Sequence, residues 1–342
     1  MDASKDRLYF GDVRNCRIRA VDLHTGIIDT VAGVGNEDGD IGDGLAAIRA
    51  TVSTHPMRVS LDDQSHLYIA DAHQARIRRV DAVSGIISTV AGNGEEGFAG
   101  DGGLATQASL FSPHAARVDR YGHLYIADTQ NDRVRKVCGE SGVITTVAGD
   151  GRTEFSGDGV AAVEASLSGP LSVDIDDGGH LFIVDRWHHR IRRVDAMSGI
   201  ISTVAGTGAE GPLQDGVAAT AAEFMTLRDI LFGPDGHLYI VDGDSSRIGR
   251  LDLDVGRIEI VAGNGTAGFS GDGGPAVDAC LDHPYSAAFD PSGHLYIFDT
   301  QNSRIRKVDA VSGIISTVAG NGTTGFSGDG GPATDATVGF GG

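Results

Sequence analysis

Residues 293–333 read GHLYIFDTQNSRIRKVDAVSGIISTVAGNGTTGFSGDGGPA, and this stretch recurs in diverged form throughout the upstream chain. One aspartate marks each copy, at Asp12, Asp71, Asp128, Asp185, Asp242 and Asp299. The first interval is 59 residues and each later one is 57 residues. A fixed spacing of this kind indicates a repeat architecture, here of six copies.

Each copy predicts four short antiparallel strands. In the last copy the β-rich runs are 286–290, 295–298, 304–308 and 314–318, and each is too short to be a helix. Gly293 and Gly313 end two connections of the kind that hairpins require. A long glycine-rich crossover with one short helical turn then leads to the next copy.

A lone four-stranded sheet cannot bury both of its apolar faces, so we expect the copies to pack face to face until a ring closes. The repeat leaves no linker, and residues 1–342 are therefore predicted to form one all-β domain, a six-bladed β-propeller. The first copy begins within its innermost strand. We expect both termini to close blade 1, with residues 1–4 beside 338–342; the alternative is that a longer natural protein supplies that strand.

The repeated residues carry a resemblance to a known family. The pattern of LYIFD at 295–299 followed by RIRKVD at 304–309 resembles the NHL-repeat β-propellers, particularly bacterial forms with long GNGxxGFSGDGGPA crossovers. The resemblance implies the six-bladed ring and names no activity by itself.

The composition limits the classes of partner. A formal net charge of -20 argues against nucleic acid, which some relatives bind, because phosphate contacts require clustered Lys and Arg. Three cysteines at unrelated repeat positions give no disulfide framework. The chain shows no export signal and no apolar run of membrane-spanning length. We expect a soluble monomer, cytoplasmic as supplied and with no membrane partner, while a secreted origin stays open.

Features that recur in every copy are interpreted as structural. The marker aspartate and the arginine five residues later, such as Asp299 and Arg304, are expected to tie strands or adjacent blades together. The crossover aspartates are interpreted as turn formers, with calcium ligation as the alternative; they are Asp43, Asp101, Asp158, Asp215, Asp272 and Asp329.

A binding site on a ring of near-identical blades must break the repeat, so we examined the positions that rim one mouth of the channel. Two residues after each marker aspartate the copies read Arg14, His73, Gln130, Trp187, Asp244 and Gln301. At the start of the innermost strand they read Met57, His114, Leu171, Arg228 and Tyr285. Deeper in the channel, Arg58 and Asp229 should face each other across the opening, and Arg117 and Asp174 should form a bridge. A solvated rim without function is the alternative to a site.

These breaks supply the candidate site. The candidates for catalysis are His73, His114, Arg58, Tyr285 and Asp244. The candidates for substrate binding are Arg14, Met57, Trp187, His188, Arg228 and Asp229. Histidines would transfer protons or ligate a metal, arginines would hold an anionic group, and Trp187 would stack on an apolar part of the ligand.

The Pro113-His114 pair is similar to the arrangement that supplies zinc-binding histidines in the peptide-amidating lyase, another NHL-type propeller. That resemblance extends to His114 only, because the other copies carry Leu171, Arg228 and Tyr285 at this position. A divalent metal such as zinc or calcium therefore stays an open alternative.

Two functions fit this pattern. The leading interpretation is a lyase or hydrolase that processes a small molecule at the mouth of the channel. The alternative is a non-catalytic scaffold that binds a peptide or protein over the same rim.

Overall fold

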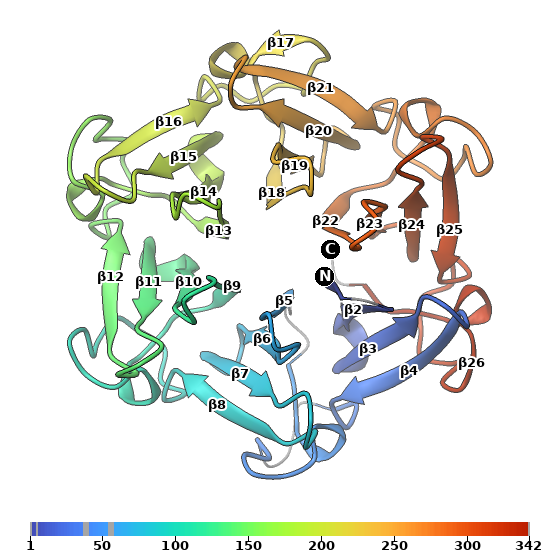
Figure 1. The fold of residues 1–342 in the computed structure, drawn as a ribbon, viewed down its shortest axis with the longest axis horizontal. Helices are drawn as coiled ribbons and strands as arrows, with labels where there is room; N and C mark the ends of the chain where they lie inside the picture. Colours follow the sequence, from blue (N-terminus) through green and yellow to red (C-terminus); the bar gives the residue numbers. More distant parts are fainter. Residues whose placement is uncertain (1, 5, 37–40, 54–57, 341–342) are drawn as a thin grey trace.

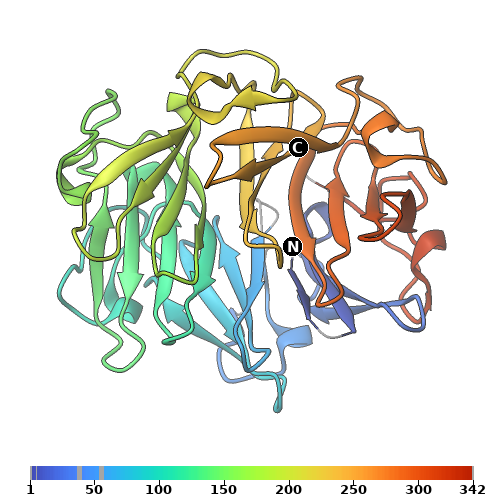
Figure 2. The same cartoon turned by 45° about the horizontal axis from the view of Figure 1, so that its top comes forward.

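The computed structural model describes residues 2–4, 6–36, 41–53 and 58–340. Over these residues the chain forms six antiparallel sheets around a central opening (Figure 1). Figure 2, tilted by 45°, shows the strands of the blades running from one face of the ring toward the other. The all-β six-bladed propeller predicted from the repeat is confirmed.

The blades follow one another in chain order. Blade 1 contains β1 (Asp2–Ser4), β2 (Arg7–Asp12), β3 (Arg17–Asp22), β4 (Ile27–Ala32) and β26 (Gly331–Pro332). Blade 2 contains β5 (Arg58–Leu61), β6 (Leu67–Asp71), β7 (Arg76–Val80) and β8 (Ile87–Ala91). Blade 3 contains β9 (Pro113–Val118), β10 (Leu124–Asp128), β11 (Arg133–Val137) and β12 (Ile144–Ala148).

The second half of the ring repeats this order. Blade 4 contains β13 (Pro170–Ile175), β14 (Leu181–Asp185), β15 (Arg190–Val194) and β16 (Ile201–Ala205). Blade 5 contains β17 (Val217–Ala218), β18 (Leu227–Phe232), β19 (Leu238–Asp242), β20 (Arg247–Asp252) and β21 (Arg257–Ala262). Blade 6 contains β22 (Pro284–Phe289), β23 (Leu295–Asp299), β24 (Arg304–Val308) and β25 (Ile315–Ala319).

Short 3-10 turns connect these strands. Between the second and third strands of a blade lie η1 (Val13–Asn15), η4 (Thr129–Asn131) and η6 (Arg186–His188). The crossovers carry η2 (Ala47–Arg49), η3 (Ala105–Gln107), η5 (Ala162–Glu164), η7 (Ala219–Ala221), η8 (Ala276–Asp278) and η9 (Ala333–Asp335). Each crossover turn buries its first alanine, as the helical turn predicted for the crossovers requires.

Both ends of the chain complete blade 1. Strand β1 is its innermost strand, and the C-terminal segment leads up to that position. The carbonyl of Gly339 accepts a hydrogen bond from the amide of Arg14 at 2.9 Å. In blade 4 the carbonyl of Ser168, just before β13, accepts from Trp187 in the same way at 3.1 Å. The predicted closure is confirmed, and β26 additionally covers the outer edge of β4.

The hydrophobic core lies between blades. Six clusters of buried residues among those described each combine side chains of two adjacent blades. At the closing interface Phe340 is 3% exposed, and its ring centroid lies 3.9 Å from that of Phe298 and 6.0 Å from that of Phe10. The C-terminal segment therefore joins blade 6 to blade 1 by aromatic packing.

We predict that Phe340→Ala lowers the free energy of unfolding by about 3 to 5 kcal/mol, because it leaves a cavity where the ring closes. Chemical denaturation measures this loss. Val311→Ala is the control, since Val311 is 96% exposed and its truncation should change stability by about 0.5 kcal/mol at most. Equal small effects of both substitutions would show that closure does not depend on this segment.

A buried arginine fastens each crossover to the blade that follows it. Arg135 has no exposed surface, and its Nη2 lies 2.6 Å from Asp101 in the preceding crossover. Its Nη1 lies 3.2 Å from the marker aspartate Asp128. The ring of Phe98 lies 4.8 Å from the same guanidinium. We call this arginine with its crossover aspartate the clasp.

The clasp corrects the arginine assigned as the partner of the marker aspartate. That partner is the arginine seven residues later, not the one five residues later: Asp299 pairs with Arg306 at 3.3 Å. Arg304 instead lies 3.8 Å over the ring of Phe269 and donates to the carbonyl oxygens of Asn302 and Asn321. The other clasps are Arg19 with Asp329, Arg78 with Asp43, Arg192 with Asp158 and Arg306 with Asp272.

Blade 5 lacks the clasp because Gly249 stands where the other blades have the arginine. A Cβ atom at Gly249 would lie 3.0 Å from the side chain of Leu213, which is fully buried. Asp215 of this crossover accepts a hydrogen bond from the amide of Ile260 instead. Apolar packing therefore replaces the ion pair at this one join.

We predict that Arg306→Ala lowers the free energy of unfolding by about 3 to 5 kcal/mol, since it leaves Asp299 buried without its counter-charge. Arg304→Ala should cost about 1 kcal/mol or less, because it removes an exposed-edge cation–π contact. The two variants form a matched pair for urea denaturation. A loss for Arg304→Ala equal to or larger than that for Arg306→Ala would contradict the assignment of the clasp.

Candidate functional site

Strand pairing brings the predicted rim positions to one mouth of the channel. Pro284 at the start of β22 lies opposite Asp299 at the end of β23, and Leu227 pairs with Asp242 in the same way. The six residues two positions after the marker aspartates are all exposed: Arg14, His73, Gln130, Trp187, Asp244 and Gln301. The structure thus gives the diverged positions a common face.

Arg58 and Asp229 meet across the channel, as predicted, but they bind each other. Arg58 Nη1 lies 2.6 Å from Asp229 Oδ1, and the two side chains are 7% and 3% exposed. Ser172 and Ser286 donate to the same carboxylate at 2.5 and 2.6 Å. Burial alone would raise the pKa of Asp229, but Arg58 and Arg117 outweigh it and hold that pKa below its ordinary value. The pair is a satisfied cross-ring tie.

A second pair lies nearer the opposite mouth. Arg117 Nε is 3.9 Å from Asp174 Oδ1, which confirms the bridge predicted between adjacent blades. Asp174 also accepts a hydrogen bond from the amide of Phe232 at 2.7 Å. Burial raises the pKa of Asp174 although Arg117 acts against it. Contacts along the inner strands therefore hold blades 3, 4 and 5 together.

The rim of blades 4, 5 and 6 gathers a basic and aromatic group that we call the arginine rim: Arg186, Trp187, Arg228, Asp244 and Tyr285. The guanidinium carbon of Arg186 lies 4.2 Å over the indole of Trp187, which is 60% exposed. Arg58 and Arg228 lie 5.0 and 5.4 Å from the ring of Tyr285. Arg228 is 3.8 Å from Asp244. These four interactions link three blades on one face.

Glycines shape two of these contacts. A Cβ atom at Gly243 would lie 2.9 Å from Cγ of Arg228, so this arginine lies directly on the glycine. A Cβ atom at Gly169 would lie 2.6 Å from the indole of Trp187. Both side chains are therefore seated on backbone, which limits the directions in which they can point.

Arg186 was missed in the sequence analysis, although the sequence carries a signal for it. The equivalent residues of the other copies are Val13, Ala72, Thr129, Gly243 and Thr300, none of which is charged. The comparison had been made one residue later, at Trp187. Burial and the neighbouring charge of Arg228 lower the pKa of Arg186, which places the two guanidinium groups within electrostatic reach of each other.

The histidines are engaged in different ways. His188 is buried; its Nδ1 lies 2.9 Å from Asp185 and its Nε2 lies 2.9 Å from the carbonyl oxygen of Thr153. Asn131 makes the equivalent two contacts in blade 3, so His188 occupies a structural position of the repeat. His114 is half-buried with Nδ1 2.9 Å from the carbonyl oxygen of Ser112, and His73 is exposed.

Two further candidates lie outside the arginine rim. The amide of Arg14 is part of the closure of blade 1, and its side chain is exposed. Met57 lies outside the described residues. Within the described ranges, no group of three or more His, Cys, Asp or Glu side chains could hold a metal ion.

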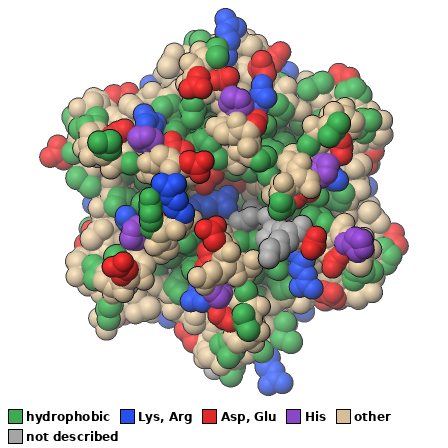
Figure 3. Space-filling model, viewed as in Figure 1, with side chains coloured by type: hydrophobic (Ala, Val, Ile, Leu, Met, Phe, Trp, Pro, Cys, Tyr) green, Lys and Arg blue, Asp and Glu red, His purple; other side chains and the backbone are tan. Residues whose placement is uncertain are grey.

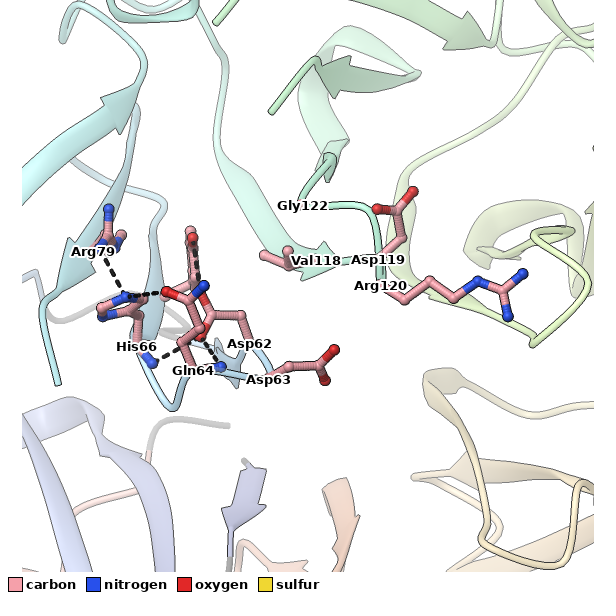
Figure 4. A pocket seen from close by; sticks show the side chains of 10 residues that line it. Asp62, Asp63, Gln64, His66, Arg79, Val118, Asp119, Arg120 and Gly122 are labelled. Atoms are coloured by element: carbon pink, nitrogen blue, oxygen red, sulfur yellow. Dashed lines mark hydrogen bonds between the residues drawn. The ribbon is translucent and has the colours of Figure 1, made fainter. Parts of the chain in front are cut away.

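The opposite face carries pockets between blades. One of about 580 Å³ is bounded by Tyr121, Tyr125 and Lys136. Figure 4 shows a smaller one, of about 240 Å³, in which His66 contacts Gln64 and Arg79 at 3.1 and 2.9 Å. The polar groups of this smaller pocket therefore bind one another.

The histidine that precedes each second strand joins the two hairpins of its blade on this opposite face. His66, His123, His180 and His294 each accept a hydrogen bond from a backbone amide of the next hairpin. Their interpretation as structural residues is confirmed. Figure 3 shows one face of the ring, with histidines spaced around it and Lys and Arg side chains beside the central opening.

Comparison with known sequences supports the repeat. A sequence model of the NHL repeat matches residues 167–194. The chain is 28% identical over 282 residues to protein SUPPRESSOR OF QUENCHING 1 of Arabidopsis thaliana, covering 79% of this chain and 26% of that protein. It is 30% identical over 295 residues to mouse teneurin-1, covering 76% and 11%. Human NHL repeat-containing protein 2 is 25% identical, covering 74% and 38%.

Two of these relatives are much longer than the chain, which spans only 26% of the plant protein and 11% of the teneurin. Among solved structures, an auxiliary nutrient binding protein of Bacteroides ovatus superimposes with a TM-score of 0.61 at 17% identity, covering 91% of this chain and 66% of that one. A streptogramin B lyase superimposes with a TM-score of 0.50 at 14% identity, covering 92% and 80%. These likenesses establish the fold. No helix of the described residues is long and apolar enough to cross a membrane.

Proposed function

The chain is a six-bladed NHL-repeat β-propeller, and we propose that it binds a peptide segment of a partner over the arginine rim. Proteins with this fold are titled both as lyases and as binding proteins, so the fold does not choose between the two functions. The side chains at the rim must decide.

The observation that carries the proposal is the exposed indole of Trp187. It is the only tryptophan in the chain, it stands at a position where no other copy has an aromatic residue, and 60% of it is exposed. An exposed tryptophan held in place by a neighbouring arginine and by backbone is the usual anchor of a binding surface. Tyr285 of blade 6 extends the aromatic surface toward the channel.

The groups deeper in the channel also favour binding over catalysis. A catalytic acid, base or nucleophile must face the substrate with polar atoms that the protein has not already satisfied. Arg58 and Asp229 satisfy each other, and both ring nitrogens of His188 lie within hydrogen-bonding distance of protein oxygens. Three of the residues assigned to the site are thereby committed to the fold.

A lyase or hydrolase is the second candidate. His73 is exposed and His114 is half-buried on the rim face, and imidazole is the side chain best suited to proton transfer near neutral pH. Under this proposal His73 and His114 transfer protons, and Arg228 holds an anionic group of the substrate.

We predict that peptides selected from a displayed random library against this protein lose about tenfold or more in affinity on Trp187→Ala, because the anchor is removed. Tyr121→Ala is the matched control, since Tyr121 is a 65% exposed aromatic residue near the opposite mouth. Peptides that bind Trp187→Ala as tightly as the parent protein would refute the binding proposal. Turnover of a screened substrate that is lost in His114→Ala and kept in Trp187→Ala would support the enzyme instead.

A further inference from the structure

The charges at the arginine rim do not balance. Arg58 is neutralised by Asp229, which leaves Arg186 and Arg228 with the single carboxylate of Asp244. That carboxylate also accepts a hydrogen bond from Thr226 at 2.7 Å and lies 3.6 Å from His283. Two guanidinium groups therefore share one aspartate that has other partners.

The fold does not need either arginine. At the position of Arg186 the other blades carry small or aliphatic residues, and at the position of Arg228 they include Leu171 and Tyr285. Bringing two like charges together in partial burial costs free energy unless an anion offsets it. The buried Nε of Arg186 has no hydrogen-bond partner among the described residues, so a donor is left over at this point. Both observations indicate a missing acceptor.

The aromatic groups define what lies beside that acceptor. One face of the Trp187 indole is covered by Arg186, while 60% of the side chain remains exposed. An aliphatic or aromatic group could therefore stack on the indole while an attached anion reaches the guanidinium groups. The acidic remainder of the protein opposes such a ligand weakly, because exposed charges more than about 8 Å away are screened at physiological salt.

We propose that Arg186 and Arg228 together bind a carboxylate that lies next to an apolar group of the ligand, with that apolar group on Trp187. This inference rests on the proposed binding function and adds the chemistry of its ligand. A peptide C-terminus and a small apolar carboxylic acid both have this chemistry.

The single tryptophan makes the test direct, since its fluorescence reports on this rim alone. N-acetylphenylalanine is titrated against its primary amide, which differs only in lacking the charge. We expect saturable binding of the acid and binding of the amide weaker by about tenfold or more. A tripeptide ending in free phenylalanine is titrated in parallel; tighter binding than the acid identifies a peptide terminus, and equal binding identifies a small acid.

Variants assign the effect to the two arginines. Arg186→Gln and Arg228→Gln should each weaken the acid by about tenfold and leave the amide unchanged. Arg120→Gln is the charge control, because Arg120 is exposed beside Tyr121 away from the rim. No response to the acid, or equal affinity for acid and amide, would overturn the inference. So would affinity for the acid that neither glutamine substitution changes.

The failures of the two proposals can be told apart. If acid and amide bind equally and library peptides still depend on Trp187, the rim binds ligands without reading their charge. If library peptides are indifferent to Trp187, the binding proposal itself fails.

Discussion

In five of the six blades among the described residues, an arginine side chain with no exposed surface holds a carboxylate from the chain segment before it. A fully buried guanidinium would be very costly without charged partners, so the crossover must fold against the next blade for either to be stable. Burial also raises the pKa of the marker aspartates Asp128 and Asp299 to about 6, despite the neighbouring arginines. The blades are thus made mutually dependent, and the ring behaves as one unit.

Because the clasps and the cores between blades carry stability, the rim residues are released from that task. The six positions after the marker aspartates are exposed, and they hold different kinds of side chain in nearly every copy. Only blades 4 to 6 combine arginine and aromatic side chains there. The site is therefore local and asymmetric on a scaffold that is close to symmetric, which is what recognition of one ligand requires.

The sequence was sufficient for the architecture and for the face on which the copies diverge. Spacing determines which residues reach the rim, because the direction of a strand side chain follows from its register. It does not determine which partner a long side chain selects. Arg306 rather than Arg304 reaches Asp299, and Arg58 reaches Asp229 across 171 positions of sequence. Such contacts depend on the curvature of the whole ring, and Arg186 was missed because only one position of each turn was compared.

The clasp has a consequence for how such a chain can arise. Each repeat carries the aspartate in its exit segment and the arginine in its body, so the exit of one copy fits the body of any other copy. Tandem duplication of the gene segment then creates a complete new interface at once, with no compensating substitution. The residues SGIISTVAG are still identical at 84–92, 198–206 and 312–320, while blade 5 has exchanged its arginine for glycine and filled the space with Leu213. Descent by duplication thus leaves the joins interchangeable and lets each rim position acquire its own ligand contacts.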